Sequence, residues 1–147
     1  METGISRHLE HVAITREHYP FVVGTFSDCL QAESWMTSES RHVHERALLR
    51  ALRDPSALAI VVTPRGYPDE LIGWSVAMPT ALLFAYVRYP FRRGRLGHHF
   101  GTDLIERVCQ SWVPCAVWTR AASRMAAKGF PTRYDIDEHE KFLQLAR

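Results

Sequence analysis

The residues best suited to chemistry in this sequence form a basic, glycine-bearing turn. Arg92, Arg93 and Arg95 stand beside Gly94 and Gly97. They follow an apolar run and precede a segment with helical periodicity, so the stretch predicts a strand, a loop and a helix. The first turn of a helix presents unpaired backbone N–H groups and the positive end of its dipole, which together bind anions. The turn therefore predicts a phosphate or pyrophosphate site.

Three side chains are candidates for proton transfer. Tyr86 lies at the end of the apolar run before the turn, His44 lies on a predicted helix, and Tyr134 lies in the C-terminal part of the chain. Histidine titrates near neutral pH, and a positioned tyrosine can act as an acid or a base. Packing is the competing interpretation for Tyr86, and a solvated helix face is the competing one for His44.

The eight histidines do not have the spacing of a metal site. On a helix, His42 and His44 would point about 200° apart, and His98 and His99 about 100° apart. Neither pair has the i, i+4 spacing with which two side chains on one helix face bind zinc. We therefore expect no metal.

The composition indicates a single domain that spans residues 1–147. Of the 147 residues, 46% are hydrophobic and 23% are charged, which is typical of a globular chain with one core. The net charge of +2 is too small to argue for nucleic-acid binding. The apolar runs are too short to span a bilayer, so no membrane is expected. The odd number of cysteines, without C-x-x-C spacing, favours small core residues in a reducing cytosol: Cys29, Cys109 and Cys115.

Hydrophobic periodicity and turn residues predict the order strand, two helices, three strands, helix, strand, helix and an amphipathic tail. The predicted segments are a strand at His11–Thr15, a helix from Pro20, a helix capped by Ser38 or Ser40, strands at Ala57–Val62, Leu71–Met78 and Ala81–Val87, a helix from Phe100 to about Ser111, a strand at Cys115–Thr119, a helix at Arg120–Lys128 and a tail at Glu138–Leu145.

The turn also carries a family motif. Val87, Arg92 and Gly97 have the spacing of the acyl-CoA-binding segment of the GNAT superfamily, the Gcn5-related N-acetyltransferases, which this stretch resembles. In that pattern a strand ends in Val, five residues lead to an Arg or Gln, and x-x-G-x-G/A opens a helix. One position departs from it, because Arg95 stands where the motif has its first glycine, and Gly94 is displaced by one residue.

The resemblance implies an α/β (α+β) fold with a mixed, mostly antiparallel central sheet flanked by helices. The sheet would be splayed at one edge to admit the pantetheine arm, and the C-terminal part would be abbreviated. The sequence looks most like short GNAT-like proteins encoded by phages and prophages, in which a Gly-Trp strand precedes a "YV…FRR" segment. Here these are Gly73-Trp74 and Tyr86-Val87 with Phe91-Arg92-Arg93.

The implied function is acyl-CoA-dependent N-acyltransfer, in which an amine directly attacks acetyl-CoA. The backbone N–H near Val87 would polarise the acyl oxygen. The loop from Arg92 to His98 would hold the pyrophosphate, and Tyr134 would protonate the leaving thiolate. The residues expected at the coenzyme are Ala85, Val87, Arg92, Arg93, Gly94, Arg95, Leu96, Gly97 and His98.

The acceptor side is expected at the loop 31–40 and the helix after it, where Trp35 and His42 are the candidate substrate-binding residues. Their mixture of apolar and titratable groups suits an amine acceptor, either a small molecule or a protein. Two alternatives stay open: a non-catalytic binding module with this fold, and a phage-type enzyme that modifies nucleic-acid bases, which is not favoured. The chain is expected to be a monomer or homodimer in the cytoplasm, that of the bacterial host for a phage-encoded protein.

Overall fold

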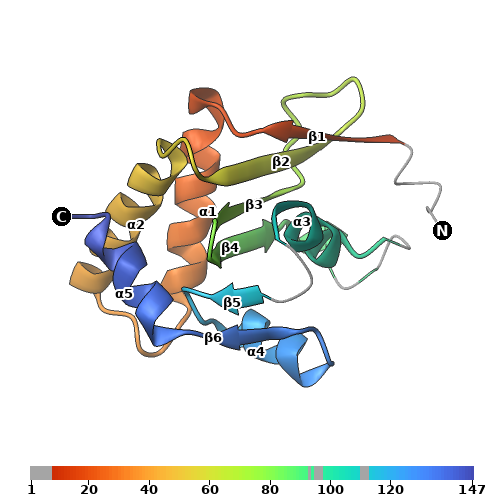
Figure 1. Cartoon of the computed structure of the whole chain (residues 1–147). Helices are drawn as coiled ribbons and strands as arrows, with labels where there is room; N and C mark the ends of the chain where they lie inside the picture. Colours follow the sequence, from red (N-terminus) through yellow and green to blue (C-terminus); the bar gives the residue numbers. More distant parts are fainter. Residues whose placement is uncertain (1–7, 93, 95–97, 110–112) are drawn as a thin grey trace.

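Six strands form one mixed sheet with helices on both faces (Figure 1). This computed structural model describes residues 8–92, 94, 98–109 and 113–147. Each strand pairs with the next strand in the sequence, first in three antiparallel pairs and then in two parallel ones. The predicted mixed α/β fold is confirmed. The strands are β1 Leu9–Ala13, β2 Leu58–Pro64, β3 Gly73–Met78, β4 Ala81–Val87, β5 Val113–Cys115 and β6 Thr132–Tyr134.

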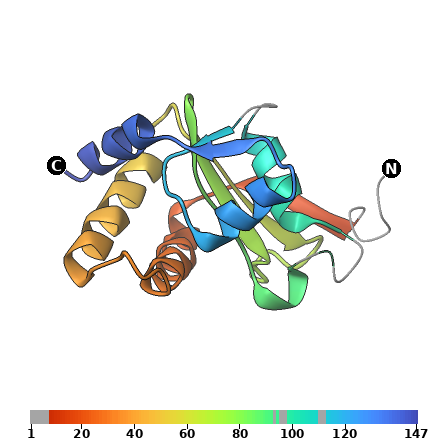
Figure 2. The ribbon, with the colours of Figure 1, turned by 90° about the horizontal axis from the view of Figure 1, so that it is seen from below.

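Helices α1, α2 and α5 cover one face of the sheet, and α3 and α4 cover the other (Figure 2). In the described ranges, no helix is both long enough and apolar enough to cross a bilayer. Two single turns of 3-10 helix, Arg16–His18 and Tyr89–Phe91, precede α1 and follow β4. The helices are α1 Tyr19–Gln31, α2 Ser38–Leu52, α3 Phe100–Val108, α4 Arg120–Ala127 and α5 Ile136–Gln144.

The sheet has a core on each side because neighbouring residues of a strand point to opposite faces. In β2, Val61 packs under α1, α2 and α5, whereas Val62 packs under α3. Trp74 is fully buried in the first of these cores, where its indole N–H donates to Thr25 Oγ1 at 2.8 Å. Phe26 of α1 meets the Trp74 ring edge-on, so the aromatic cluster holds α1 against the sheet.

Strands β4 and β5 pair only where β4 begins. One pair of residues is in register, Leu82 with Cys115, and the Ala116 N–H donates to the Leu82 carbonyl at 3.0 Å. Beyond that point β4 continues to Val87, while the chain after β5 turns away toward α4. The sheet is therefore open along the second half of β4, as the resemblance implies.

The structure corrects the predictions for the C-terminal third. The strand predicted at 115–119 ends instead at Cys115, because Ala116 and Val117 are buried in the core after leaving the edge of β4. Ala116 and Val117 are apolar because they are buried in the core and not because they belong to a strand. A short strand, β6, follows α4 where none was predicted, and the amphipathic tail is α5.

Candidate active site

The open edge of β4 presents backbone donors. The Arg88 N–H donates to the Ile72 carbonyl at 2.8 Å, which places it on the β3 side. Successive backbone groups of a strand point to opposite edges. The N–H groups of Val87 and Ala85 therefore point to the other edge, from which the chain after β5 has moved away. Two aligned backbone donors at such an opening can polarise a carbonyl oxygen.

The side chain of Arg92 contacts the end of β4. Its Nε donates to the Val87 carbonyl at 2.5 Å, and its guanidinium carbon lies 5.4 Å from the centre of the Tyr86 ring. Tyr86 is half-buried and packs between Phe21 and Trp74, with ring centres 6.0 and 6.4 Å away. Arg92 thus places a positive charge beside the open edge, and the Tyr86 ring supports that charge.

Of the basic turn, Arg92, Gly94 and His98 belong to the described residues. Gly94 has a φ of 68°, and a Cβ there would lie 2.7 Å from a ring carbon of His99, so a side chain would meet both strain and a clash. The positive φ therefore favours glycine at 94, one residue before the position where the family motif has it. The predicted coenzyme residues Arg93, Arg95, Leu96 and Gly97 lie outside the described residues.

His98, also predicted at the coenzyme, is held against α3. Its Nε2 lies 3.3 Å from Asp103 Oδ2, and its ring meets Phe100 edge-on with ring centres 4.6 Å apart. Asp103 also lies 3.1 Å from Arg107 Nε and 3.1 Å from His11 Nε2. The first turn of α3 therefore carries a carboxylate that is already matched by neighbouring basic groups.

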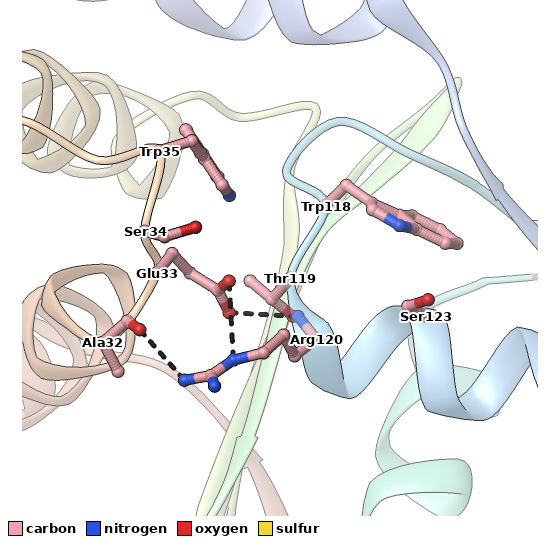
Figure 3. Close-up of a pocket in the computed structure, with 8 residues that line it drawn as sticks. All are labelled: Ala32, Glu33, Ser34, Trp35, Trp118, Thr119, Arg120 and Ser123. Carbon is pink, nitrogen blue, oxygen red and sulfur yellow. Dashed lines mark hydrogen bonds and ion pairs between the residues drawn. The ribbon is translucent and has the colours of Figure 1, made fainter.

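A pocket of about 330 Å³ lies between the end of α1 and the start of α4. Trp35 and Trp118 stand on opposite sides of it, with Glu33 and Arg120 between them (Figure 3). Glu33 accepts a hydrogen bond from the Arg120 backbone N–H at 3.0 Å, and its side chain is only 9% exposed. The pocket thus combines two aromatic walls with a shielded carboxylate.

Three side chains next to these walls form a line of hydrogen bonds. Tyr134 Oη lies 2.7 Å from His139 Nδ1, and His139 Nε2 lies 3.0 Å from His44 Nε2. The line ends at the Ser40 carbonyl, 2.7 Å from His44 Nδ1. It therefore crosses from β6 through α5 to α2.

The two tryptophans of the pocket contact this line at both ends. The Trp35 ring centre lies 5.9 Å from that of His44 and 6.4 Å from that of His139. The Trp118 ring centre lies 6.4 Å from that of Tyr134. The hydrogen-bonded line therefore borders the pocket behind its aromatic walls.

Burial sets the protonation of the two histidines. It lowers the pKa of His44, and a hydrogen bond to the Ser40 carbonyl opposes this change. Burial also lowers the pKa of His139, as does the nearby His44, whereas Glu140 raises it. For Tyr134, burial raises the pKa, and the neighbouring carboxylates act in the same direction. At neutral pH the line consists of uncharged groups.

No family model and no curated protein matches the chain. Among solved structures, one described as a probable acetyltransferase is 17% identical, with 92% of this chain and 86% of that chain covered and a TM-score of 0.48. A second, an aminoglycoside acetyltransferase from an uncultured soil metagenomic sample in complex with trehalose, is 14% identical. That match covers 97% of this chain and 90% of the other, with a TM-score of 0.43. Both similarities are distant.

The structure brings three of the predicted residues together. His44 and Tyr134 belong to the same hydrogen-bonded line, and Trp35 lies against it. His44 is 1% exposed, so it does not belong to a solvated helix face. His42 lies on the exposed side of α2, 3.5 Å from Glu45, and does not line the pocket. Tyr86 belongs to the aromatic packing at the end of β4.

Sequence reasoning missed His139, the middle residue of the line. The signal was present, because His139 precedes Phe142 by three residues in a segment already seen to be amphipathic. Residues three apart share one helix face, and Phe142 is buried. His139 could thus have been placed on the buried face of α5, but its partner, 95 residues away in the sequence, could not.

The cysteine thiols stay protonated at neutral pH. Burial raises the pKa of Cys109 to about 11, and also raises the pKa of Cys29 and Cys115. A thiol needs to be a thiolate to attack a carbonyl. These residues therefore act as core side chains, as the sequence predicted.

Proposed function

We propose that this chain is an acyl-CoA-dependent N-acyltransferase that transfers an acetyl group from acetyl-CoA to an amine by direct attack. The observation that carries the proposal is the open edge of β4, where the N–H groups of Val87 and Ala85 face away from β3 with no registered partner in the described part of β5. Acyl transfer places negative charge on the carbonyl oxygen, and such a pair of donors stabilises that charge.

The surroundings of this edge fit an acyl-CoA. The thioester supplies an activated acyl group. Arg92 holds a positive charge at the end of β4, and Gly94 has the positive φ of 68° that glycine allows. The carboxylate of Asp103 at the first turn of α3 forms an ion pair with Arg107, so it does not leave an unmatched negative charge there.

The pocket between Trp35 and Trp118 is the proposed acceptor site. Aromatic faces attract cations, so the two tryptophans suit an amine, while the carboxylate of Glu33 is paired with the Arg120 side chain at 3.9 Å. The acceptor would therefore be a small amine or an amine-bearing side chain.

The first prediction is that CoA and acetyl-CoA stabilise the folded protein. A ligand at about 100 times its dissociation constant adds about 2.7 kcal/mol to the free energy of unfolding. Thermal melting with and without millimolar acetyl-CoA measures this effect, and acetyl transfer to a panel of amines measures turnover. Trp35→Ala is expected to keep the thermal shift and to lose turnover, because Trp35 lines the acceptor pocket and packs on His44 and His139 but belongs to none of the expected coenzyme residues.

A melting temperature that ignores both coenzymes would refute the proposal. Stabilisation without transfer to any amine would point to a binding module. Binding of DNA with a steep salt dependence would favour action on nucleic-acid bases.

A further inference from the structure

The direction of each hydrogen bond in the line from Tyr134 to Ser40 follows from its buried end. A carbonyl oxygen only accepts, so His44 carries its proton on Nδ1 and donates it to Ser40. In neutral His44 the Nε2 is then an acceptor, and His139 must donate to it from its own Nε2. The Nδ1 of His139 is left as an acceptor, so the Tyr134 hydroxyl donates inward.

One added proton reverses the two hydrogen bonds that join Tyr134, His139 and His44. When Tyr134 Oη takes up a proton, its own proton passes to His139 Nδ1. The proton on His139 Nε2 can then pass to His44 Nε2, which leaves His44 charged and still bonded to Ser40. In this state His139 donates to Tyr134, and the hydroxyl proton of Tyr134 points outward. The same residue that accepted a proton is then ready to give one.

We propose that Tyr134, His139 and His44 form a proton relay that takes the proton of the attacking amine and returns it to the leaving thiolate. This inference rests on the proposed function. Transfer forms a bond between the amine nitrogen and the acyl carbon and breaks the bond between that carbon and the thioester sulfur. The amine loses one proton and the thiolate gains one, so the relay ends each cycle as it began. His139 is the positioning residue through which Tyr134 reaches His44.

The placement of the relay suits this role. Tyr134 is 39% exposed, His139 is half-buried and His44 is 1% exposed, so solvent and substrate reach the Tyr134 end of the line most readily. Trp35 and Trp118 line the acceptor pocket and pack on the two ends of the relay. An amine held between them lies beside the exposed end.

Burial and the neighbouring charges leave both histidines of the relay uncharged, so the relay has a vacant place for one proton. His139 is faced by His44 from α2, by Tyr134 from β6 and by Glu140 from α5 itself, while Asp135 and Glu140 face Tyr134. Burial lowers the pKa of both histidines, which keeps them uncharged at neutral pH. Two such groups in contact titrate as a pair.

Nitrogen NMR of the unaltered protein tests the relay without any assay. At pH 7.5 we expect His44 protonated on Nδ1 and His139 protonated on Nε2. As the pH falls, both rings should change together and take up one proton as a pair before a second. A His139 ring that carries its proton on Nδ1 at pH 7.5, or two independent titrations, would overturn the relay.

Steady-state kinetics test whether catalysis depends on the relay. His139→Gln keeps a donor and an acceptor but cannot carry a proton, so kcat is expected to fall by about 10²- to 10⁴-fold with acceptor KM unchanged. The unaltered enzyme should lose rate below a pKa that lies under the usual histidine value of about 6.5, and the variant should lose that limb of the pH profile. His8→Gln, the same change at an exposed residue, should alter neither.

Tyr134→Phe keeps the ring on Trp118 and removes the hydroxyl, so it should match His139→Gln even if the latter folds poorly. If the unaltered protein acetylates an amine and both variants keep its rate and pH profile, the relay is wrong and the proposed function stands. If the unaltered protein acetylates none, the proposed function fails, and the catalytic role of the relay fails with it.

Discussion

Gly73 shows how a single position controls the approach of β3 to β4. A Cβ at this residue would lie 2.4 Å from the Tyr86 carbonyl oxygen and 3.2 Å from a methyl carbon of Leu104. The first of these neighbours is backbone and cannot turn aside. The glycine of the Gly73-Trp74 pair therefore has a steric cause: it lets β3 and β4 pair closely and lets α3 pack on the face of the sheet opposite to Trp74.

Gly73→Ala is expected to lower the free energy of unfolding by about 1–3 kcal/mol, the usual cost of overpacking. Gly24→Ala serves as the control, since Gly24 lies inside α1 with nothing within 4 Å of the added Cβ. Alanine there should stabilise the helix by up to about 1 kcal/mol. Urea unfolding of both variants measures the two changes. Equal stability of Gly73→Ala and the parent protein would contradict the packing described for β3 and β4.

The sequence predicted which residues could do chemistry better than it predicted which residues they contact. His44 and Tyr134 were candidates because their side chains can transfer protons. Their connection could not be predicted, because it depends on His139 and on the packing of α5 against α2. Likewise, the sequence could not show that Asp103, which holds His98, also contacts His11, since His11 comes from β1.

Helix α5 positions the middle of the relay, and its start is well defined. Asp135 Oδ1 accepts hydrogen bonds from the backbone N–H groups of Asp137 and Glu138, at 3.0 and 3.2 Å. This is the arrangement of an N-cap, in which a side chain satisfies donors that the helix leaves free. His139 lies one turn further along, so the cap also determines where its ring lies.

Asp135→Ala is therefore expected to cost about 1 kcal/mol of stability and to disturb His139 as well. Asp135→Asn keeps the accepting oxygen and should retain most of the stability. Thermal unfolding measures the first effect, and the NMR signals of the His139 ring measure the second. An alanine variant with unchanged melting and unchanged ring signals would show that the cap does not hold α5.

Element order was predictable because it depends on local patterns. The strand predicted at Ala81–Val87 has the bounds of β4. The N-cap of α2 is Thr37, one residue before Ser38, the first of the two predicted caps. The predictions failed after β5, where Ala116 and Val117 are buried but do not belong to a strand. Hydrophobicity reports burial, and a buried segment without strand partners looks like a strand.

Across the whole molecule, three histidines are held uncharged by folding. Burial is the main cause of the lowered pKa of His11, His44 and His139. A base whose pKa is lower in the folded state binds fewer protons there than in the unfolded chain. Its contribution to stability is complete above the unfolded value of about 6.5 and is lost as the pH falls from there toward the folded value.

The free energy of unfolding should accordingly decrease between pH 7.5 and pH 5.5. Urea titrations at the two pH values measure the difference, and carboxyl groups with pKa values near 4 contribute little in this window. His139→Gln removes one of the three groups and should make the decrease smaller. Stability that stays constant or rises toward pH 5.5 would contradict the burial of these rings.

The strand order has a consequence for how the protein is made. Since every strand pairs with its neighbour in the sequence, the sheet can grow in the order in which a ribosome delivers the chain. His44 emerges early on α2, but its partner comes from α5, after all six strands. During synthesis the scaffold therefore exists before the relay does, and a nascent chain gains its proton pathway only when α5 docks onto α2.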